Sequence, residues 1–248
     1  MAILVTRPAP DNAKTAAALR ARGHEVLLSP MLRFEPVTFE DDGEIDFDAV
    51  ILSSANAVRA IEDHPVRARL MLLPVFAVGE HTAKIARDAG FTNITIADGD
   101  AISLRGRIVE SAAAGKLKKK AALCYLAGAD LTRDLGGELG ARGFTVVTRT
   151  AYRMVPIAGL SDVVSDAFRA GTIDAVMHYS RRSARAYLNA ARADGVEISA
   201  LALPQCCISE AVAGVLRDAG AMQVAAANAP DEKALLDVVD RMVKASSA

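Results

Sequence analysis

Two long, similar segments of the sequence form an internal repeat, and this repeat constrains the fold more than any other feature. Residues 73–91 match residues 203–221 at eight of nineteen positions, an offset of 130. Two further pairs resemble each other, 20–36 with 140–156 at an offset of 120, and 48–60 with 174–186 at an offset of 126. Offsets that grow in chain order are expected from one duplication followed by small insertions. Each half, roughly 1–115 and 120–248, is therefore one copy of the same design.

Each copy alternates short apolar runs with segments of helical pattern. The runs lie at 2–6, 25–30, 48–53, 75–78 and 93–97, and at 122–127, 145–150, 174–179, 206–209 and 223–227. Runs this short, apolar on both faces, are typical of central strands in parallel sheets. Their alternation with helices predicts an α/β fold of doubly wound parallel sheets, internally duplicated.

The repeated tetrapeptide Arg-Asp-Ala-Gly, at 87–90 and 217–220, has a structural explanation. In both copies it ends a segment of helical pattern, and glycine is the residue that most readily takes the left-handed conformation at a helix end. We therefore expect two helix stops here rather than catalytic residues.

The composition excludes several classes of function. The 248 residues carry a net charge of -1 with acids and bases interspersed, so no basic face for nucleic acid is expected. No apolar run approaches the roughly 18 residues of a membrane span, and the first residues lack the features of a signal peptide. The cysteines, Cys124, Cys206 and Cys207, lie in apolar runs without metal-ligand spacing. We expect a cytoplasmic protein with reduced, buried thiols and no membrane contact.

Small polar residues follow the expected strands in both copies. They form six turns, at Thr6–Arg7, Ser53–Asn56, Gly79–Thr82, Gly128, Ser180–Ser183 and Ser209–Glu210. Ligands of parallel α/β sheets bind at these carboxyl ends, where free N–H groups at helix starts attract anions. A single hydroxyl residue there is explained as a helix N-cap, but six such turns together favour a ligand with many carboxylates.

Motifs of nucleotide binding and acyl transfer are absent from the sequence. It contains no Walker A pattern, no G-x-G-x-x-G fingerprint after a strand and no G-x-S-x-G elbow. The histidines, His24, His64, His81 and His178, do not lie at metal-ligand spacing. We expect no metal and no cofactor, and a reaction that needs mainly positioning and one proton donor.

Five segments in this order and spacing resemble those of the uroporphyrinogen-III synthase family. They are ILVTRP at 3–8, VILSSANAV at 50–58, FAVGEHTAKIARDAGF at 76–91, TAYRMVP at 150–156 and CISEAVAGVLRDAG at 207–220. The resemblance covers essentially the whole chain. The duplication and the missing cofactor motifs, both observed independently of it, agree with the resemblance.

The resemblance implies two doubly wound α/β domains joined by a two-stranded linker. The first domain is expected to be discontinuous, with residues 1–35 plus 156–248, and the second to hold residues 36–155. The crossings would be 33–37 and 152–156, each with a proline that suits an extended connector. The family's active site is the cleft between the domains, which the strand-end turns would face.

The activity implied is that of a cyclising hydro-lyase in haem, chlorophyll and cobalamin biosynthesis. Family members convert hydroxymethylbilane, a linear tetrapyrrole with eight carboxylates, to uroporphyrinogen III with loss of water and inversion of ring D. The implied partner is this small-molecule substrate, with no nucleic acid and no membrane. We expect a monomer, with at most transient contact with the preceding enzyme of the pathway.

The resemblance also implies roles for individual residues. Tyr152 matches the tyrosine of the family's cleft, which implies that it donates a proton to the departing hydroxyl; a connector residue packed against a domain edge is the alternative. Arg7 would be a charge partner for the substrate or, equally, a brace of the fold. The expected substrate-binding residues are Arg7, Ser53, Ser54, Thr82, Ser180, Ser183 and Ser209.

One turn departs from the family pattern. Many members carry threonines in the turn equivalent to Ser209–Val212, where this chain has Ala211 and Val212. Ser209 and backbone N–H groups would replace their hydrogen bonds. Because Glu210 is unfavourable beside a polyanion, we expect it to point away or to bind an arginine.

Two other functions suit the same layout on physical grounds. One is a non-catalytic two-domain cytoplasmic protein that binds a small acid or a sugar by hinge closure. The other is an enzyme acting on a phosphosugar, which would need a Lys or His base among the turns. His81 and His178 are the residues available for that role.

Overall fold

A computed structural model describes residues 2–41, 43–131 and 133–246 of the chain. The chain divides into two compact units. Unit 1 holds residues 1–33 and 155–248, and unit 2 holds residues 34–154. Each unit is built around its own sheet of mainly parallel strands.

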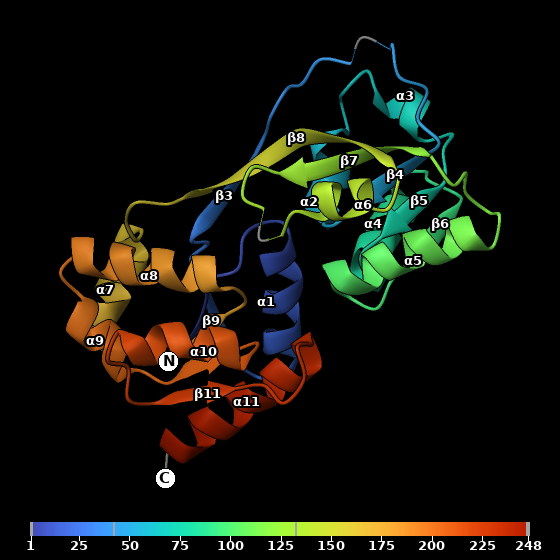
Figure 1. Ribbon diagram of the computed structural model, residues 1–248. Helices are drawn as coiled ribbons and strands as arrows, with labels where there is room; N and C mark the ends of the chain where they lie inside the picture. Colours follow the sequence, from blue (N-terminus) through green and yellow to red (C-terminus); the bar gives the residue numbers. More distant parts are fainter. Residues whose placement is uncertain (1, 42, 132, 247–248) are drawn as a thin grey trace. The chain divides into compact units, whose positions relative to one another are not determined.

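The sheet of unit 1 combines strands from both ends of the chain (Figure 1). Its strands are β1 (Ala2–Val5), β2 (Glu25–Leu28), β9 (Ile173–His178), β10 (Gln205–Cys207) and β11 (Val224–Ala226). Their order is β11-β10-β9-β1-β2, and each neighbouring pair is parallel. All four residues of β1 are buried, which explains why this run carries no polar residue.

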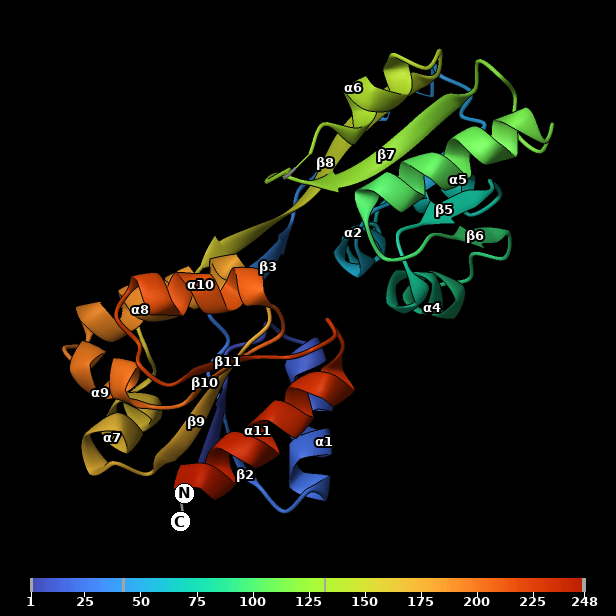
Figure 2. The same cartoon turned by 60° about the horizontal axis from the view of Figure 1, so that its bottom comes forward.

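Helices cover both faces of the unit 1 sheet (Figures 1 and 2). They are α1 (Asp11–Ala21), α7 (Asp162–Ala170), α8 (Arg181–Ala193), α9 (Glu197–Ala202), α10 (Glu210–Asp218) and α11 (Glu232–Ser246). Helices α1 and α11 lie on one face, where Leu19, Leu235 and Val239 pack against Ile3 and Val5. Helices α8 and α10 lie on the other face.

The sheet of unit 2 has six strands. They are β3 (Leu32–Pro36), β4 (Ala49–Leu52), β5 (Val75–Ala77), β6 (Ile94–Ile96), β7 (Ala122–Gly128) and β8 (Thr145–Pro156). Their order is β3-β8-β7-β4-β5-β6, and the pairs from β8 to β6 are parallel. The ends of β3 and β8 carry the chain between the units. Hydrogen bonds from Val37 N–H to Ala151 O (2.7 Å) and from Ile157 N–H to Met31 O (3.0 Å) flank this pair, so the two strands are antiparallel.

The helices of unit 2 also divide between the two faces of its sheet. They are α2 (Ala55–Ala60), α3 (Arg67–Leu70), α4 (Glu80–Asp88), α5 (Ala101–Ala113) and α6 (Leu135–Gly140). Val58 and Ala86 of α2 and α4 pack on Val50 and Leu126 on one face. On the other face, α5 and α6 pack on residues of β4 and β7 that include Ile51 and Tyr125.

The duplication is visible in the strand order of the two sheets. Unit 2 without its connector β3 has the order β6-β5-β4-β7-β8, which matches β11-β10-β9-β1-β2 element by element. Leaving β3 aside, each sheet takes three strands from one copy and two from the other. The fold class expected from the sequence, two doubly wound parallel α/β sheets from a duplicated chain, is confirmed.

Both Arg-Asp-Ala-Gly segments end a helix in the same way. Gly90 and Gly220 have φ values of +101° and +96°, in the left-handed region that favours glycine. In each case the N–H of the next residue bonds a carbonyl of the last helical turn, at 3.0 Å, from Phe91 to Ala86 and from Ala221 to Leu216. The helix-stop interpretation is therefore confirmed.

In the described part of the chain, no helix combines the length and the apolar character that crossing a membrane requires.

Candidate functional site

A polar pocket of about 380 Å³ lies at the carboxyl ends of the strands of unit 2. Residues that follow β4, β5 and β7 line it together with Tyr152 of β8. Two of the eight predicted site residues, Ser53 and Tyr152, are brought together here although they lie 99 positions apart in the sequence. A position beyond the carboxyl ends of parallel strands is where α/β folds bind ligands.

Tyr152 is half-buried and held from two sides. Its ring lies 5.8 Å from that of Phe34, and its carbonyl oxygen accepts a hydrogen bond from Ala129 N–H at 2.8 Å. A Cβ atom at Gly128 would lie 2.8 Å from Tyr152 Cζ and 3.0 Å from its hydroxyl oxygen. The phenol of Tyr152 can therefore lie at the pocket only because Gly128 has no side chain.

A second tyrosine, Tyr125, reaches the same pocket from the core. The residue is 3% exposed and packs on the α5 face of the sheet, while its hydroxyl lies 2.9 Å from Ser53 Oγ. Burial raises the pKa of Tyr125, so its hydroxyl stays protonated.

Charged side chains stand at the rim of the pocket. The Asp100 carboxylate caps α5 by accepting from Ser103 N–H at 2.7 Å, which holds the pKa of Asp100 below its usual value. Arg133 bonds Glu138, with Nη2 3.0 Å from Oε2. Since an acid is present and the arginine has an internal partner, the pocket suits an uncharged part of a ligand better than a carboxylate.

The two other predicted residues of unit 2 occupy the starts of helices. Ser54 is the N-cap of α2, with its Oγ 3.2 Å from Asn56 N. Thr82 lies in the first turn of α4 and is 4% exposed. Neither of them lines the polar pocket.

In unit 1 the predicted serines lie at two helix starts. Ser180 is the N-cap of α8: its Oγ accepts from Ser183 N–H at 3.0 Å and lies 3.0 Å from Ser183 Oγ. Ser183 is 1% exposed. Ser209 occupies the N-cap position of α10, but its side chain makes no capping hydrogen bond. Glu210 bonds Arg217, as expected from the sequence.

Arg7 is engaged in a network within unit 1. Its Nη1 lies 3.3 Å from Glu232 Oε1 and 3.2 Å from Thr15 Oγ1, and its guanidinium carbon is 4.5 Å from the ring centre of Tyr179. Thr15 and Tyr179 also donate to the same Glu232 oxygen, at 2.5 and 3.2 Å. These contacts show that Arg7 braces β1 against α1 and α11, one of the two roles considered for it.

His178 lies inside unit 1 and is fully buried. Its Nε2 is 2.8 Å from Gln205 Oε1, and its Nδ1 is 3.4 Å from Thr6 Oγ1. The amide of Gln205 donates to Ala200 O at 2.8 Å, so its Oε1 is the acceptor and His178 carries its proton on Nε2. Burial lowers the pKa of His178 to about 4, only partly offset by Gln205. His178 is thus a neutral core residue, whereas His81 is exposed at the start of α4.

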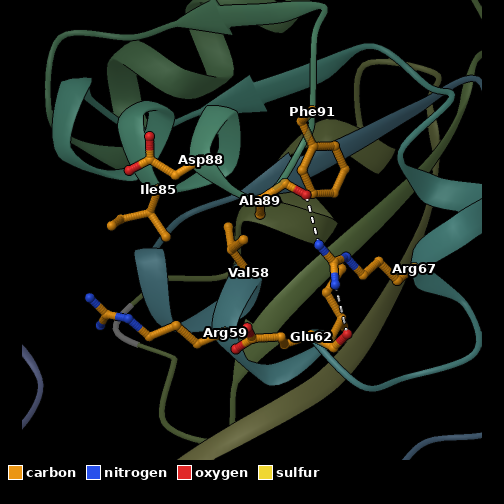
Figure 3. A pocket seen from close by; sticks show the side chains of 9 residues that line it. Val58, Arg59, Glu62, Arg67, Ile85, Asp88, Ala89 and Phe91 are labelled. Carbon is orange, nitrogen blue, oxygen red and sulfur yellow. Dashed lines mark hydrogen bonds between the residues drawn. The ribbon is translucent and has the colours of Figure 1, made fainter.

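A smaller pocket of about 210 Å³ lies elsewhere on unit 2, near the C-terminal ends of α2 and α4 (Figure 3). Its floor includes Val58, Ile85 and Phe91, and Arg67 closes one side by donating to Glu62 O (2.9 Å) and Ala89 O (2.8 Å). None of the eight predicted site residues lines it.

Among the described residues, no group of three or more His, Cys, Asp and Glu side chains is placed to hold a metal ion.

A family model described as "Uroporphyrinogen-III synthase HemD" matches residues 13–237. The chain belongs to the uroporphyrinogen-III synthase family. This family consists of lyases of tetrapyrrole biosynthesis, which cyclise hydroxymethylbilane to uroporphyrinogen III. The match supports the cyclase interpretation of the sequence and gives no support to a non-catalytic binding protein. No curated protein sequence matches the chain.

Solved structures agree with the family assignment at the level of the fold. The uroporphyrinogen-III synthetase of Helicobacter pylori superposes with a TM-score of 0.66 at 18% identity, over 97% of this chain and 99% of that one. A mutant uroporphyrinogen III synthase of Thermus thermophilus gives a TM-score of 0.58 at 17% identity, over 99% of this chain and 100% of that one.

Tyr125 was not predicted from the sequence as a residue of the site. It lies in the apolar run at 122–127, a pattern that indicates only a core residue. The strand register places it at the site: β4 and β7 pair with Ile51 opposite Tyr125, so Ser53 lies two residues further along the same face.

Proposed function

We propose that this chain closes hydroxymethylbilane to uroporphyrinogen III at the polar pocket of unit 2, with Tyr152 as the proton donor. The observation that carries the proposal is the meeting of Tyr152 and Ser53 at one strand-end pocket. Its rim acid and its internally paired arginine favour the uncharged hydroxymethyl group of the substrate there.

Tyr152 acts on the leaving group. Electrons of the adjacent pyrrole expel the hydroxyl, and the Tyr152 hydroxyl supplies the proton with which it departs as water. The substituted carbon of ring D at the other end of the chain then attacks the methylene carbon left by the hydroxyl, which gives a spiro intermediate. The bond between this ring carbon and the ring C methylene breaks, and the free α-carbon of ring D bonds that methylene instead, so ring D is inverted as the macrocycle closes. The pyrrole carbon that forms the final bond releases one proton, which balances the proton Tyr152 gave. One general acid of this kind contributes roughly 10²–10⁴-fold to the rate.

Positioning supplies most of the remaining catalysis. Holding two reacting ends together can lower a barrier by roughly 7–11 kcal/mol in favourable cases. The uncatalysed alternative is closure without inversion. A hundredfold preference for the inverted product requires only about 3 kcal/mol between two transition states.

The carboxylates of the substrate would bind at the strand-end turns of both units. We propose Ser54 and Thr82 in unit 2, and Ser180, Ser183 and Ser209 in unit 1, as the residues of these turns that hold or orient the substrate. Arg7, which is paired with Glu232, would orient the turn that follows β1. Ser209 is the best placed of the serines, since its hydroxyl is not used in a helix cap. Backbone N–H groups at the starts of α4, α8 and α10 would add donors.

We also propose that the two domains are residues 1–35 plus 156–248 and residues 36–155. The protein would work as a cytoplasmic monomer, with at most transient contact with the enzyme that makes its substrate.

The isomer of the product tests the proposal. The protein is incubated with hydroxymethylbilane generated in situ, the product is oxidised, and the porphyrin isomers are separated. Formation of the type III isomer supports the proposed function, whereas type I alone, as in buffer, rejects it.

A further inference from the structure

Tyr125 combines a rigid ring with a hydroxyl at the edge of the polar pocket. The ring is fixed in the core beneath α5, among side chains such as Ile51 and Leu104. Its hydroxyl lines the pocket and lies 2.9 Å from Ser53 Oγ. Within the described residues, Ser53 is the hydrogen-bond partner of this hydroxyl.

Only one of the two hydroxyls can donate across this single contact. The phenol O–H stays close to the plane of its ring, so packing of the ring limits the directions in which it can donate. The Ser53 hydroxyl, at the half-buried end of β4, rotates freely about its own bond. A buried donor without a partner is unfavourable, and Ser53, the less buried of the two, can reach other acceptors in the pocket or in solvent. The arrangement therefore favours Tyr125 as donor and Ser53 as acceptor.

We propose that Tyr125 is a positioning residue: it donates to Ser53 Oγ and so directs the Ser53 proton into the pocket beside Tyr152. Ser53 then donates to the bound tetrapyrrole in a fixed direction. The inference rests on the proposed function, because it assigns the pocket to that substrate. The raised pKa of Tyr125 keeps its proton in place across the working pH range.

A double-mutant cycle on Tyr125 and Ser53 tests this assignment. Ser53→Ala is expected to lower kcat/KM for type III formation roughly tenfold, the usual effect of one hydrogen bond. Tyr125→Phe keeps the ring and is expected to lower kcat/KM several-fold. In the double variant the second change should have no further effect, because Tyr125 acts through Ser53. Full activity of Tyr125→Phe, or losses that multiply in the double variant, would overturn the proposal.

A matched control separates positioning from loss of a buried hydrogen bond. Tyr187 in unit 1 is fully buried, and its hydroxyl donates to Ala200 O at 3.1 Å. Tyr187→Phe is expected to leave kcat/KM unchanged, with a loss of thermal midpoint similar to that of Tyr125→Phe, about 2–4 °C.

Binding of the oxidised product, uroporphyrin III, provides a readout that does not depend on turnover. The dissociation constant of uroporphyrin III is measured for the wild type, the two single variants and the double variant. We again expect Tyr125→Phe to have no further effect once Ser53 is alanine. If the wild type forms only the type I isomer, the proposed function is wrong. The dissociation constants of the four proteins still decide whether Tyr125 acts through Ser53. Independent effects of the two substitutions on binding would refute it even where type III product forms.

Discussion

The phenol of Tyr152 lies against Gly128, so closely that a Cβ atom there would come within 2.8 Å of the ring carbon Cζ. The two residues face each other across neighbouring strands, where the register of β7 and β8 shifts by one residue. Because the close atoms belong to the far end of a side chain, a methyl group at this position would displace the phenol rather than break the sheet.

Gly128→Ala is therefore expected to act on catalysis by moving Tyr152. Turnover should fall about tenfold to hundredfold, similar to the loss of the proton donor itself. The thermal midpoint should change little, since the displaced ring is half-buried and alanine also restricts the unfolded chain. Gly140→Ala is the control, because a Cβ at Gly140 meets no atom within 4 Å. Wild-type turnover in Gly128→Ala would show that the position of the phenol is unimportant.

Tyr152→Phe removes only the proposed proton donor. We expect kcat to fall by one to two orders of magnitude, the lower range for general acid catalysis, with KM nearly unchanged. The product that still forms should remain type III, because ring inversion depends on how the substrate is held rather than on Tyr152. Kinetics with isomer separation measures both quantities. A variant with full kcat would remove Tyr152 from the mechanism.

The parts of the fold that the sequence predicts are those set by local pattern. Every apolar run of the two copies overlaps a strand. Most of these strands are central, as expected of short runs that are apolar on both faces, whereas β2, β6 and β11 lie at sheet edges. The glycine stops at Gly90 and Gly220 were equally local, since the conformation needed there is one that glycine adopts readily.

Side-chain contacts between segments far apart in the chain could not be predicted from the sequence. Arg7 and Glu232 lie 225 positions apart, and nothing in either neighbourhood indicates that they meet. The contact of the Tyr125 hydroxyl with Ser53 depends on the register of β4 and β7, and the contact of Tyr152 with Gly128 depends on a one-residue register shift between β7 and β8. The hydrophobic pattern of the sequence specifies neither.

The bracing role of Arg7 predicts a loss of stability when the network is broken. Arg7→Met leaves the partly buried Glu232 carboxylate without its cation, so we expect the free energy of unfolding to fall by about 2 kcal/mol. Glu232→Gln should have a smaller effect, and the double variant should lose less than the sum of the two. Urea unfolding measures the free energies of all three variants.

Arg87→Met, which breaks the more exposed pair with Glu80, is the control and should change stability little. Additive losses at Arg7 and Glu232 would show that the two do not stabilise the fold as a pair.

The buried imidazole of His178 predicts a pH dependence of stability in acid. Its pKa is lowered from 6.5 to about 4 in the folded protein, so between these values the unfolded chain binds a proton that the folded chain does not. Stability therefore falls as pH falls through this window, and the contribution of His178 is fully present above pH 6.5. One pKa unit corresponds to about 1.4 kcal/mol, so the loss at about pH 4 amounts to about 3 kcal/mol.

His178→Gln keeps an N–H donor but does not titrate, and its unfolding free energy should lose this part of the slope in urea titrations from about pH 7 to about pH 4. Equal slopes in the wild type and His178→Gln would mean that His178 becomes protonated without unfolding the chain.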